Sequence, residues 1–251
     1  LVGGPVTSGF SSKTAWICDT GIDLDHPDLN VDASRAKIYT GEASADDGHG
    51  HGSHTAGTVG AKKNDDGVVG VAAGIELVPM KVLSNSGSGY FSYSIQAFDH
   101  IAANGSSGYV VNYSVGPTSR YTDTDLDDAA KGVGAKGIHI CLAAGNSNDN
   151  TTYYSPARVN GTNVYTIASM GKKGRKYSKS SFSNYGSSVD WFEPVESVLS
   201  TYKNGGYATS SGTSMAAPHA AGILAVGSIK SGGNVSNVPS GTTNKWGMIS
   251  N

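Results

Sequence analysis

Short apolar runs rich in Val, Ile and Tyr alternate along the chain with longer stretches in which apolar residues recur at helical spacing. This alternation is typical of βαβ units built on a parallel sheet. The predicted strands are residues 14–18, 36–39, 76–82, 108–113, 137–143 and 163–168. The predicted helices are residues 51–59, 90–103, 124–135 and 214–228. Together they predict an α/β fold in one domain that covers residues 1–251.

Three regions do not follow this pattern. Residues 171–209 contain "SFSNYG", "VDWFEP" and "VLSTY", which resemble short antiparallel strands and turns. Both ends of the chain, residues 1–12 and 232–251, are polar and poorly patterned. The sequence assigns no helix or strand to these ends.

Composition narrows the classes of function. A chain of 251 residues with 37% hydrophobic residues can bury a substantial core. Its net charge of −2 and scattered lysines give no basic stripe, so nucleic acid is not an expected partner. No apolar run approaches the roughly 18–20 residues that span a bilayer, so no membrane partner is expected either. The chain starts at Leu1 without a methionine or signal peptide, which favours a processed, secreted form or a trimmed one.

The two cysteines, Cys18 and Cys141, lie inside the apolar runs "TAWICD" and "GIHICLAAG". In such runs cysteine behaves as a small buried hydrophobic residue. Two free thiols are therefore favoured, and a disulfide between them is the minor alternative.

Polar residues gather where the predicted strands end and the helices begin. The first strand runs out into Asp19, and the strand 137–143 leads into "AAGN", which ends at Asn146. The segments "HGSHTAG" and "SGTSMAAPHAAG" place His51 and Ser214 at helix starts. In open parallel sheets the chemistry collects at this carboxyl edge. We therefore expect these four side chains to share one edge of the sheet.

These residue types fit nucleophilic catalysis. A serine hydroxyl needs a base to take its proton, and a histidine base needs an acid to fix its tautomer. Zinc is one alternative, but the three histidines of "GHGHGSH" (48–54) straddle a loop and a helix start, which is a weak ligand spacing. An aspartic protease is another, but it needs two "DTG" loops and the chain has one, at 19–21. The serine mechanism is favoured.

Four motifs resemble the subtilisin family of serine proteases: "DTGID" (19–23), "HGSHTAGTVG" (51–60), "AAGN" (143–146) and "GTSMAAPHAAG" (212–222). The resemblance implies a three-layer fold with a central, mostly parallel sheet flanked by helices. It also implies a catalytic triad of Asp19, His51 and Ser214, with Asn146 and the backbone N–H of Ser214 as the oxyanion hole. His49 is then expected to be solvated, and His54 to make a structural hydrogen bond.

The resemblance extends to substrate binding. It implies that a peptide lies between two edge segments, with Gly87, Ser88 and Gly89 on one side and Ser114, Val115 and Gly116 on the other. It places Phe91 at the pocket for the fourth residue before the cut. Ala143, Ala144 and Gly145 would edge the pocket for the residue before the cut, and such small walls suggest large apolar or aromatic side chains there. A plain surface turn at residues 86–89 is the alternative.

Calcium is the ion that the resemblance implies. Asp28 and Asn64 would give side-chain oxygens, while Lys62, Asp66 and Val68 would give carbonyl oxygens. Calcium takes six to eight oxygen ligands, so a mixed set of this kind is chemically reasonable.

The leading hypothesis is a secreted, monomeric endopeptidase of broad specificity that acts on proteins or peptides, with an N-terminal prosegment removed on maturation. Another hypothesis is a catalytically idle subtilisin-like module that binds peptides. The third is a selective processing protease, which would use acidic residues to recognise basic substrates. Near the pocket segments only Asp149 is acidic.

Overall fold

The fold is seen in a computed structural model that describes residues 3–10, 12–174 and 176–250. In this part of the chain ten strands form one mixed sheet, in the order β11-β12-β8-β6-β5-β4-β1-β3-β2, with β7 paired to β6. The inner strands are β1 (Thr14–Asp19), β3 (Glu76–Lys81), β4 (Val110–Tyr113), β5 (His139–Ala143), β6 (Val164–Lys173) and β8 (Val189–Pro194). All pairs among these inner strands are parallel. The predicted α/β class is confirmed.

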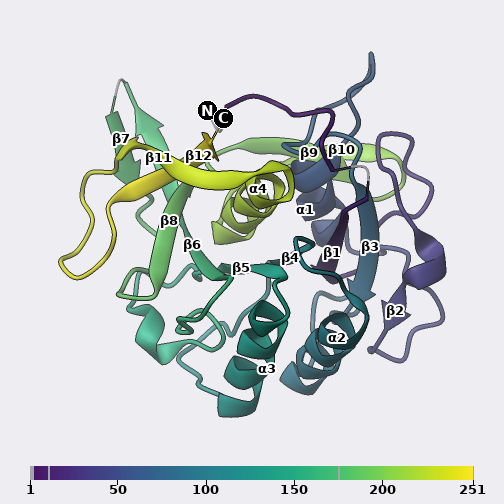
Figure 1. Ribbon diagram of the computed structural model, residues 1–251, viewed down its shortest axis with the longest axis horizontal. Helices are drawn as coiled ribbons and strands as arrows, with labels where there is room; N and C mark the ends of the chain where they lie inside the picture. Colours follow the sequence, from purple (N-terminus) through teal and green to yellow (C-terminus); the bar gives the residue numbers. More distant parts are fainter. Residues whose placement is uncertain (1–2, 11, 175, 251) are drawn as a thin grey trace.

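Helices cover both faces of the sheet (Figure 1). One face carries α2 (Phe91–Asn104) and α3 (Thr124–Ala135), and the other carries α1 (His51–Gly60) and α4 (Thr213–Val226). Side chains along β1 alternate between the two cores, because successive residues of a strand point to opposite faces. Ala15 and Ile17 pack with α1 and α4, whereas Trp16 and Cys18 pack with α2 and α3. This is the expected three-layer arrangement.

The region 171–209 differs in part from its prediction. The hairpin of β9 (Val198–Tyr202) and β10 (Gly206–Ser210) is antiparallel, as predicted. β7 (Lys176–Lys179) also pairs antiparallel, with β6. β8, in contrast, is a parallel strand of the main sheet, so the antiparallel assignment of "VDWFEP" was wrong. β6 and β8 are linked without a helix, and the sequence therefore lacks the helical signal that marks most parallel crossovers.

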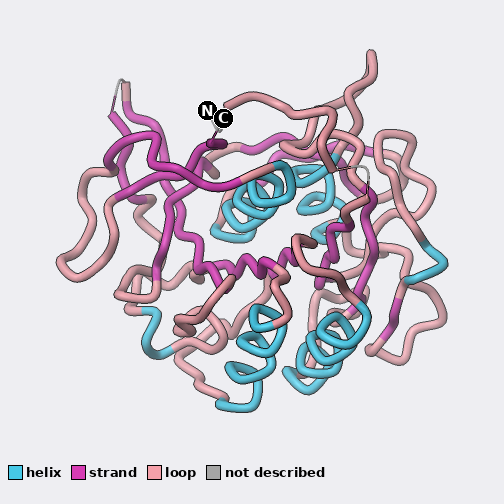
Figure 2. Tube along the Cα trace, in the orientation of Figure 1, coloured by secondary structure: helices cyan, strands magenta, loops and turns pink. Residues whose placement is uncertain are grey.

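The polar C-terminal end is also part of the sheet. β11 (Ser228–Asn234) and β12 (Lys245–Ser250) form an antiparallel pair, and β12 adds to β8. The predicted helix 214–228 accordingly ends at Val226, and Ser228 begins a strand. This strand was not predicted because β11 is largely exposed, so its residues are mostly polar and show no apolar pattern. Figure 2 shows the pair as strands along one side of the molecule.

The remaining elements are short: β2 (Lys37–Ile38), which pairs with β3 at the outer edge of the sheet, and the 3₁₀ helices η1 (Ala33–Arg35) and η2 (Thr151–Tyr153). Cys18 and Cys141 are buried free thiols that belong to the cores on opposite faces of the sheet. Within the described residues no helix is long and apolar enough to cross a membrane.

Candidate active site

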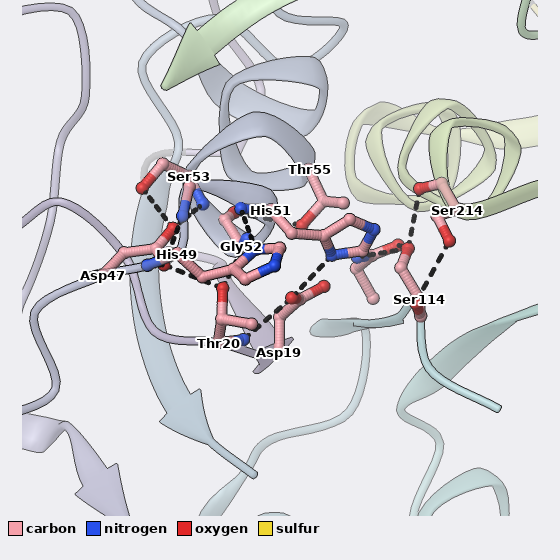
Figure 3. Close-up of polar contacts among 12 residues, drawn as sticks. Asp19, Thr20, Asp47, His49, His51, Gly52, Ser53, Thr55, Ser114 and Ser214 are labelled. Carbon is pink, nitrogen blue, oxygen red and sulfur yellow. Dashed lines mark hydrogen bonds and ion pairs between the residues drawn. The ribbon is translucent and has the colours of Figure 1, made fainter. Parts of the chain in front are cut away.

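The carboxyl edge of the sheet brings Asp19 and His51 into contact. Asp19 ends β1 and is fully buried, and His51 begins α1. The Nδ1 atom of His51 lies 2.7 Å from Oδ1 of Asp19, and the backbone N–H of Thr20 donates to the same oxygen at 2.8 Å. A carboxylate can only accept, so Nδ1 carries the proton and neutral His51 presents Nε2 as an acceptor. Figure 3 shows the imidazole between Asp19 and Ser214.

A second acid, Asp47, fixes the start of α1. Its Oδ2 accepts from the backbone N–H of Ser53 at 2.8 Å and from the Ser53 hydroxyl at 2.7 Å. Its Oδ1 accepts from the backbone N–H groups of His49 and Gly50, and from the Thr20 hydroxyl. The bond from the Ser53 N–H satisfies a donor that the first turn of a helix leaves without a partner, and the bonds from His49 and Gly50 fix the backbone that leads into the helix. Asp47 was not singled out in the sequence, where it appears as one acid of a polar loop.

Gly52 explains how α1 approaches β1 so closely. A Cβ atom at this position would lie 2.0 Å from the carbonyl oxygen of Gly21 and 3.2 Å from the Asp19 Cβ. The N–H of Gly52 instead donates to the Thr20 hydroxyl at 2.9 Å. The glycine after His51 is thus what allows the histidine to reach the acid.

Burial and charge act in opposite directions on His51. Burial alone would lower its pKa, but the charge of Asp19 and its hydrogen bond, with a further contribution from Asp47, raise the pKa above the ordinary histidine value. Asp19 therefore stabilises the imidazolium form that a proton shuttle must pass through.

Ser214 lies in the first turn of α4, and its surroundings are set by Pro218. Proline has no N–H, so it cannot bond the carbonyl four residues earlier, which is that of Ser214. The Ser114 hydroxyl donates to this freed carbonyl at 2.8 Å, and the Ser214 hydroxyl donates to the Ser114 carbonyl at 3.2 Å (Figure 3). In the described structure the Ser214 hydroxyl therefore bonds Ser114 and not His51. The predicted helix start at Ser214 is one residue late, because α4 begins at Thr213.

Thr213 orients the Asn146 side chain. The Oδ1 atom of Asn146 accepts from the backbone N–H of Thr213 at 2.9 Å and from its hydroxyl at 3.0 Å. Because Thr213 holds Oδ1, the amide nitrogen of Asn146 is the atom that can donate a hydrogen bond to a substrate. Asn146 lines the cleft beside Ser214, so this donor faces the same space as the serine.

A cleft of about 650 Å³ connects these residues. Its lining includes His51, Ser214 and Asn146, and all but one of the predicted substrate residues: Gly87, Ser88, Gly89, Phe91, Ser114, Val115, Gly116, Ala143 and Gly145. Ala144 is the exception, because its side chain is buried in the core with Ala168 and Phe192. Thr20, Leu83, Ser94 and Pro117 also line the cleft and were not predicted.

The three histidines of "GHGHGSH" have separate surroundings. The Nε2 atom of His54 lies 3.1 Å from the carbonyl oxygens of both Val198 and Ala208, which is the structural role expected for it. His49 is partly buried rather than solvated. It lines the cleft, and its ring lies 6.3 Å from that of His51. Within the described residues no group of three His, Cys, Asp or Glu side chains is placed to hold a metal ion.

Among the predicted calcium residues, Asn64 and Val68 contact the Asp28 side chain, Lys62 bonds the Asp28 backbone carbonyl, and Asp66 bonds Asn64. The Asp28 carboxylate is buried, and no cationic side chain among the described residues forms an ion pair with it. Its Oδ1 accepts from the Asn64 amide at 2.8 Å, while its Oδ2 accepts from the Val68 N–H at 3.1 Å and the Tyr207 hydroxyl at 3.3 Å. A buried carboxylate, an amide side chain and the backbone carbonyl oxygens of the loop are the types of ligand that calcium binds. Binding would require Asn64 to turn its amide oxygen towards the ion.

Comparison with known proteins identifies the family of the chain. The model of the subtilase family, peptidase S8, matches residues 16–232. The chain belongs to the subtilase family. This subtilase is 41% identical over 229 residues to alkaline serine exoprotease A of Vibrio alginolyticus, covering 88% of this chain and 40% of that protein. It is 39% identical to M-protease of Shouchella clausii, covering 87% of this chain and 54% of that protein.

The subtilase thus spans about half the length of these curated relatives. Among solved structures, a cold-adapted subtilisin-like serine proteinase superposes with a TM-score of 0.80 at 34% identity, covering 100% of this chain and 96% of that one. Sphericase superposes with a TM-score of 0.75 at 32% identity, covering 87% of this chain and 77% of that one. The subtilisin-like fold expected from the motifs is confirmed.

Proposed function

We propose that this chain is the catalytic domain of a serine endopeptidase of broad specificity. The observation that carries the proposal is the 2.7 Å contact between Asp19 and His51 at the rim of a cleft that also holds Ser214 and Asn146. A peptide-binding module without activity would have no need of a histidine whose pKa is raised by a buried acid.

In the proposed reaction the Ser214 hydroxyl turns from the Ser114 carbonyl towards Nε2 of His51. Catalytic hydrogen bonds are often formed only once substrate is bound, so the resting contact with Ser114 is compatible with this step. The serine oxygen attacks the peptide carbonyl carbon as His51 takes the hydroxyl proton, and Asp19 stabilises the imidazolium. His51 then gives the proton to the leaving amine. Water, activated by His51 in the same way, releases the acyl group from Ser214.

Negative charge develops on the carbonyl oxygen during the attack. We assign the Asn146 amide and the backbone N–H of Ser214 as its donors. The N–H of Ser214 belongs to the first turn of α4, where it has no acceptor within the helix. Because Thr213 holds the Asn146 oxygen, the amide is oriented before substrate arrives, and little reorganisation accompanies the reaction.

The substrate would bind as an extended strand between residues 87–89 and 114–116, through main-chain hydrogen bonds. The side chain before the cut would enter the space edged by Val115, Ala143 and Gly145, whose small walls favour large apolar or aromatic residues. Phe91 would contact the fourth residue before the cut.

A selective protease for basic residues is not favoured. Asp149, the acid that the sequence places near the pocket segments, accepts from Nε of Arg120 at 2.6 Å and from Nη2 of Arg120 at 2.9 Å. The hydrogen bond from Arg120 is the main reason that the pKa of Asp149 is lowered to about 2. A carboxylate that is already paired in this way has little capacity to select a substrate lysine or arginine.

We also propose that Asp28, Lys62, Asn64, Asp66 and Val68 hold a structural calcium ion, as the resemblance implies. The ion would neutralise the buried Asp28 carboxylate and fix the loop 62–68. The test is the melting temperature of the Ser214→Ala protein with excess calcium and with a chelator. A higher melting temperature in calcium supports the site, and equal values would mean that the bonds from Asn64, Val68 and Tyr207 hold the loop unaided.

Several properties of the whole protein follow from the same proposal. The substrates would be proteins or peptides, the enzyme would be a secreted monomer, and a prosegment would precede the catalytic domain before maturation. Gel filtration of the Ser214→Ala protein tests the monomer directly, because this variant cannot digest itself.

The activity is tested with an internally quenched peptide that carries phenylalanine in its middle and is blocked at both ends. An exopeptidase cannot cut such a peptide, so cleavage identifies an endopeptidase. We expect cleavage after phenylalanine that is abolished by Ser214→Ala and by a serine-directed sulfonyl fluoride. Absence of cleavage by well-folded protein would refute the proposal and favour the binding module.

A further inference from the structure

The loop that carries Asn146 is exposed and turns sharply. Gly145 has a φ of 100° and Asn148 a φ of 49°, both in the left-handed region. Asn146, Ser147 and Asn148 are all exposed. An oxyanion donor works only if it is held in place before charge develops. Something beneath this loop must therefore fix its backbone.

Asn184 lies directly beneath the loop and is fully buried. Its Oδ1 accepts from the backbone N–H groups of Ser147 and Asp149, both at 3.0 Å. Its Nδ2 donates to the carbonyl of Ala144 at 2.9 Å. Its own backbone N–H donates to the carbonyl of Gly145 at 2.9 Å. One buried amide thus binds the loop on both sides of Asn146.

The glycine of "AAGN" fits the same contact. A Cβ atom at Gly145 would lie 2.4 Å from Nδ2 of Asn184, so any other residue here would push the amide away. On its other side, the N–H of Gly145 donates to the Thr213 hydroxyl at 3.1 Å, and this hydroxyl also bonds Asn146. The loop is therefore clamped between α4 and the segment before β8.

We propose that Asn184 is a positioning residue for transition-state stabilisation: it holds the backbone from which the Asn146 amide reaches the oxyanion. Asn184 does not line the cleft and touches no reacting atom. Its effect on catalysis passes through Asn146. This inference rests on the proposed function of Asn146.

A double-mutant cycle tests the inference. The turnover number and KM are measured on the quenched phenylalanine peptide for the unmodified protein, Asn184→Ala, Asn146→Gly and the double variant. We expect Asn184→Ala to lower kcat at least 10-fold with KM changed less than 3-fold. In the Asn146→Gly background the same substitution should change kcat less than 2-fold, because the group that Asn184 positions is gone.

Other outcomes overturn the inference in distinguishable ways. An equal loss of kcat in both backgrounds would show a general structural effect, and no loss would show that the loop holds its shape unaided. An unchanged kcat in Asn146→Gly would refute the oxyanion role itself, and the inference with it.

Two further variants guard against failure of folding. Asn184→Asp keeps the oxygen that accepts from Ser147 and Asp149, but it replaces the donor to the Ala144 carbonyl with a second oxygen. We therefore expect a smaller loss of kcat than in Asn184→Ala. In the Asn146→Gly background this loss should again be absent. Asn163→Gly is the matched control. It removes an amide that bonds the Gly134 carbonyl at 3.0 Å, at the opposite edge of the sheet, and glycine tolerates the φ of 60° there. Its kcat should stay unchanged.

Discussion

At the scale of single residues, the site depends on contacts between groups that are far apart in the sequence. Asp19, His51, Ser214 and Asn146 could be predicted because each stands at a strand end or a helix start, and these positions converge at one edge of a parallel sheet. Their supporting groups could not. Ser114 was predicted only as a substrate-binding residue, and nothing local in the sequence indicated the two hydrogen bonds that it exchanges with Ser214 across 100 positions.

The raised pKa of His51 predicts how activity depends on pH. The base must be neutral to accept the serine proton, so activity is lost as pH falls through this pKa. Because Asp19 raises the pKa, the midpoint of the acid limb of kcat/KM should lie above about 6.5, the ordinary histidine value. The measurement is kcat/KM on the quenched peptide from pH 5 to 10. A midpoint below 6 would mean that burial outweighs the acid.

Asp19→Asn should keep the shape of the site but reverse its hydrogen bond. The asparagine amide can donate to Nδ1 and so hold His51 in the wrong tautomer, and we expect kcat to fall about 10⁴-fold with little change in KM. Steady-state kinetics on purified protein measure both constants. Asp32→Asn, at the partly buried N-cap of η1 and away from the cleft, is the control, and a similar loss there would show that the effect is not specific.

Glu193 presents a different residue-scale problem, because both of its carboxylate oxygens are buried without a hydrogen-bond partner among the described residues. Burial raises its pKa well above the ordinary value of glutamate. The folded state thus holds this proton more tightly than the unfolded state. The stabilisation is complete below the unfolded pKa, and it is lost as pH rises through the folded pKa.

Glu193→Gln removes this titration and should stabilise the protein increasingly as pH rises. The gain in the free energy of unfolding is at most about 1.4 kcal/mol per pH unit. It is measured by urea unfolding from pH 5 to 9 in the Ser214→Ala background, which prevents autolysis. A pH-independent difference between Glu193→Gln and its parent would contradict the argument.

At the scale of elements, the helices and the strands made of apolar runs were predictable, and the strands that carry polar or charged residues were not. The helices α1 to α4 each carry an apolar face or a run of small residues long enough to be recognised. β8 has six residues and places a glutamate at a fully buried position, which removed the apolar pattern of a buried strand. Its partner β6 was found, but the predicted end at residue 168 was five residues early because "MGKK" ends in lysines.

Substitution by alanine at two helical glycines should have opposite effects on the free energy of unfolding. In α4 a Cβ at Gly222 would lie 2.5 Å from the Cβ of Val71, so Gly222→Ala should cost about 1–3 kcal/mol of unfolding free energy. In α3 a Cβ at Gly132 would meet nothing within 4 Å. Gly132→Ala should therefore stabilise the protein by about 0.5–1 kcal/mol, because alanine loses less backbone entropy in a helix. Urea unfolding in the Ser214→Ala background compares the two, and effects of equal sign would refute the packing argument.

At the scale of the whole molecule, the C-terminal strands close one side of the sheet and reach the core behind the site. β12 covers the edge of β8, and Trp246 packs with Met170, Phe192 and Ala144. The indole lies against β11, where a Cβ at Gly232 would meet the ring at 2.3 Å. This arrangement was not predicted because the apolar residues that pack here, among them Val235, Trp246 and Ile249, are separated by polar residues.

Trp246→Ala should therefore weaken the fold without removing the chemistry. Truncating a large buried aromatic side chain costs about 3–5 kcal/mol, which for a chain of this length lowers the melting temperature by roughly 6–20 °C. The kcat at 20 °C should change less than 3-fold, because Trp246 does not line the cleft. Calorimetry in the Ser214→Ala background gives the melting temperature, and kinetics of the active form give kcat. Leu199→Ala, at a side chain that is 55% exposed, is the control, and its melting temperature should stay within 2 °C of the parent. A melting temperature for Trp246→Ala equal to that of the control would show that the sheet is stable without its C-terminal strands.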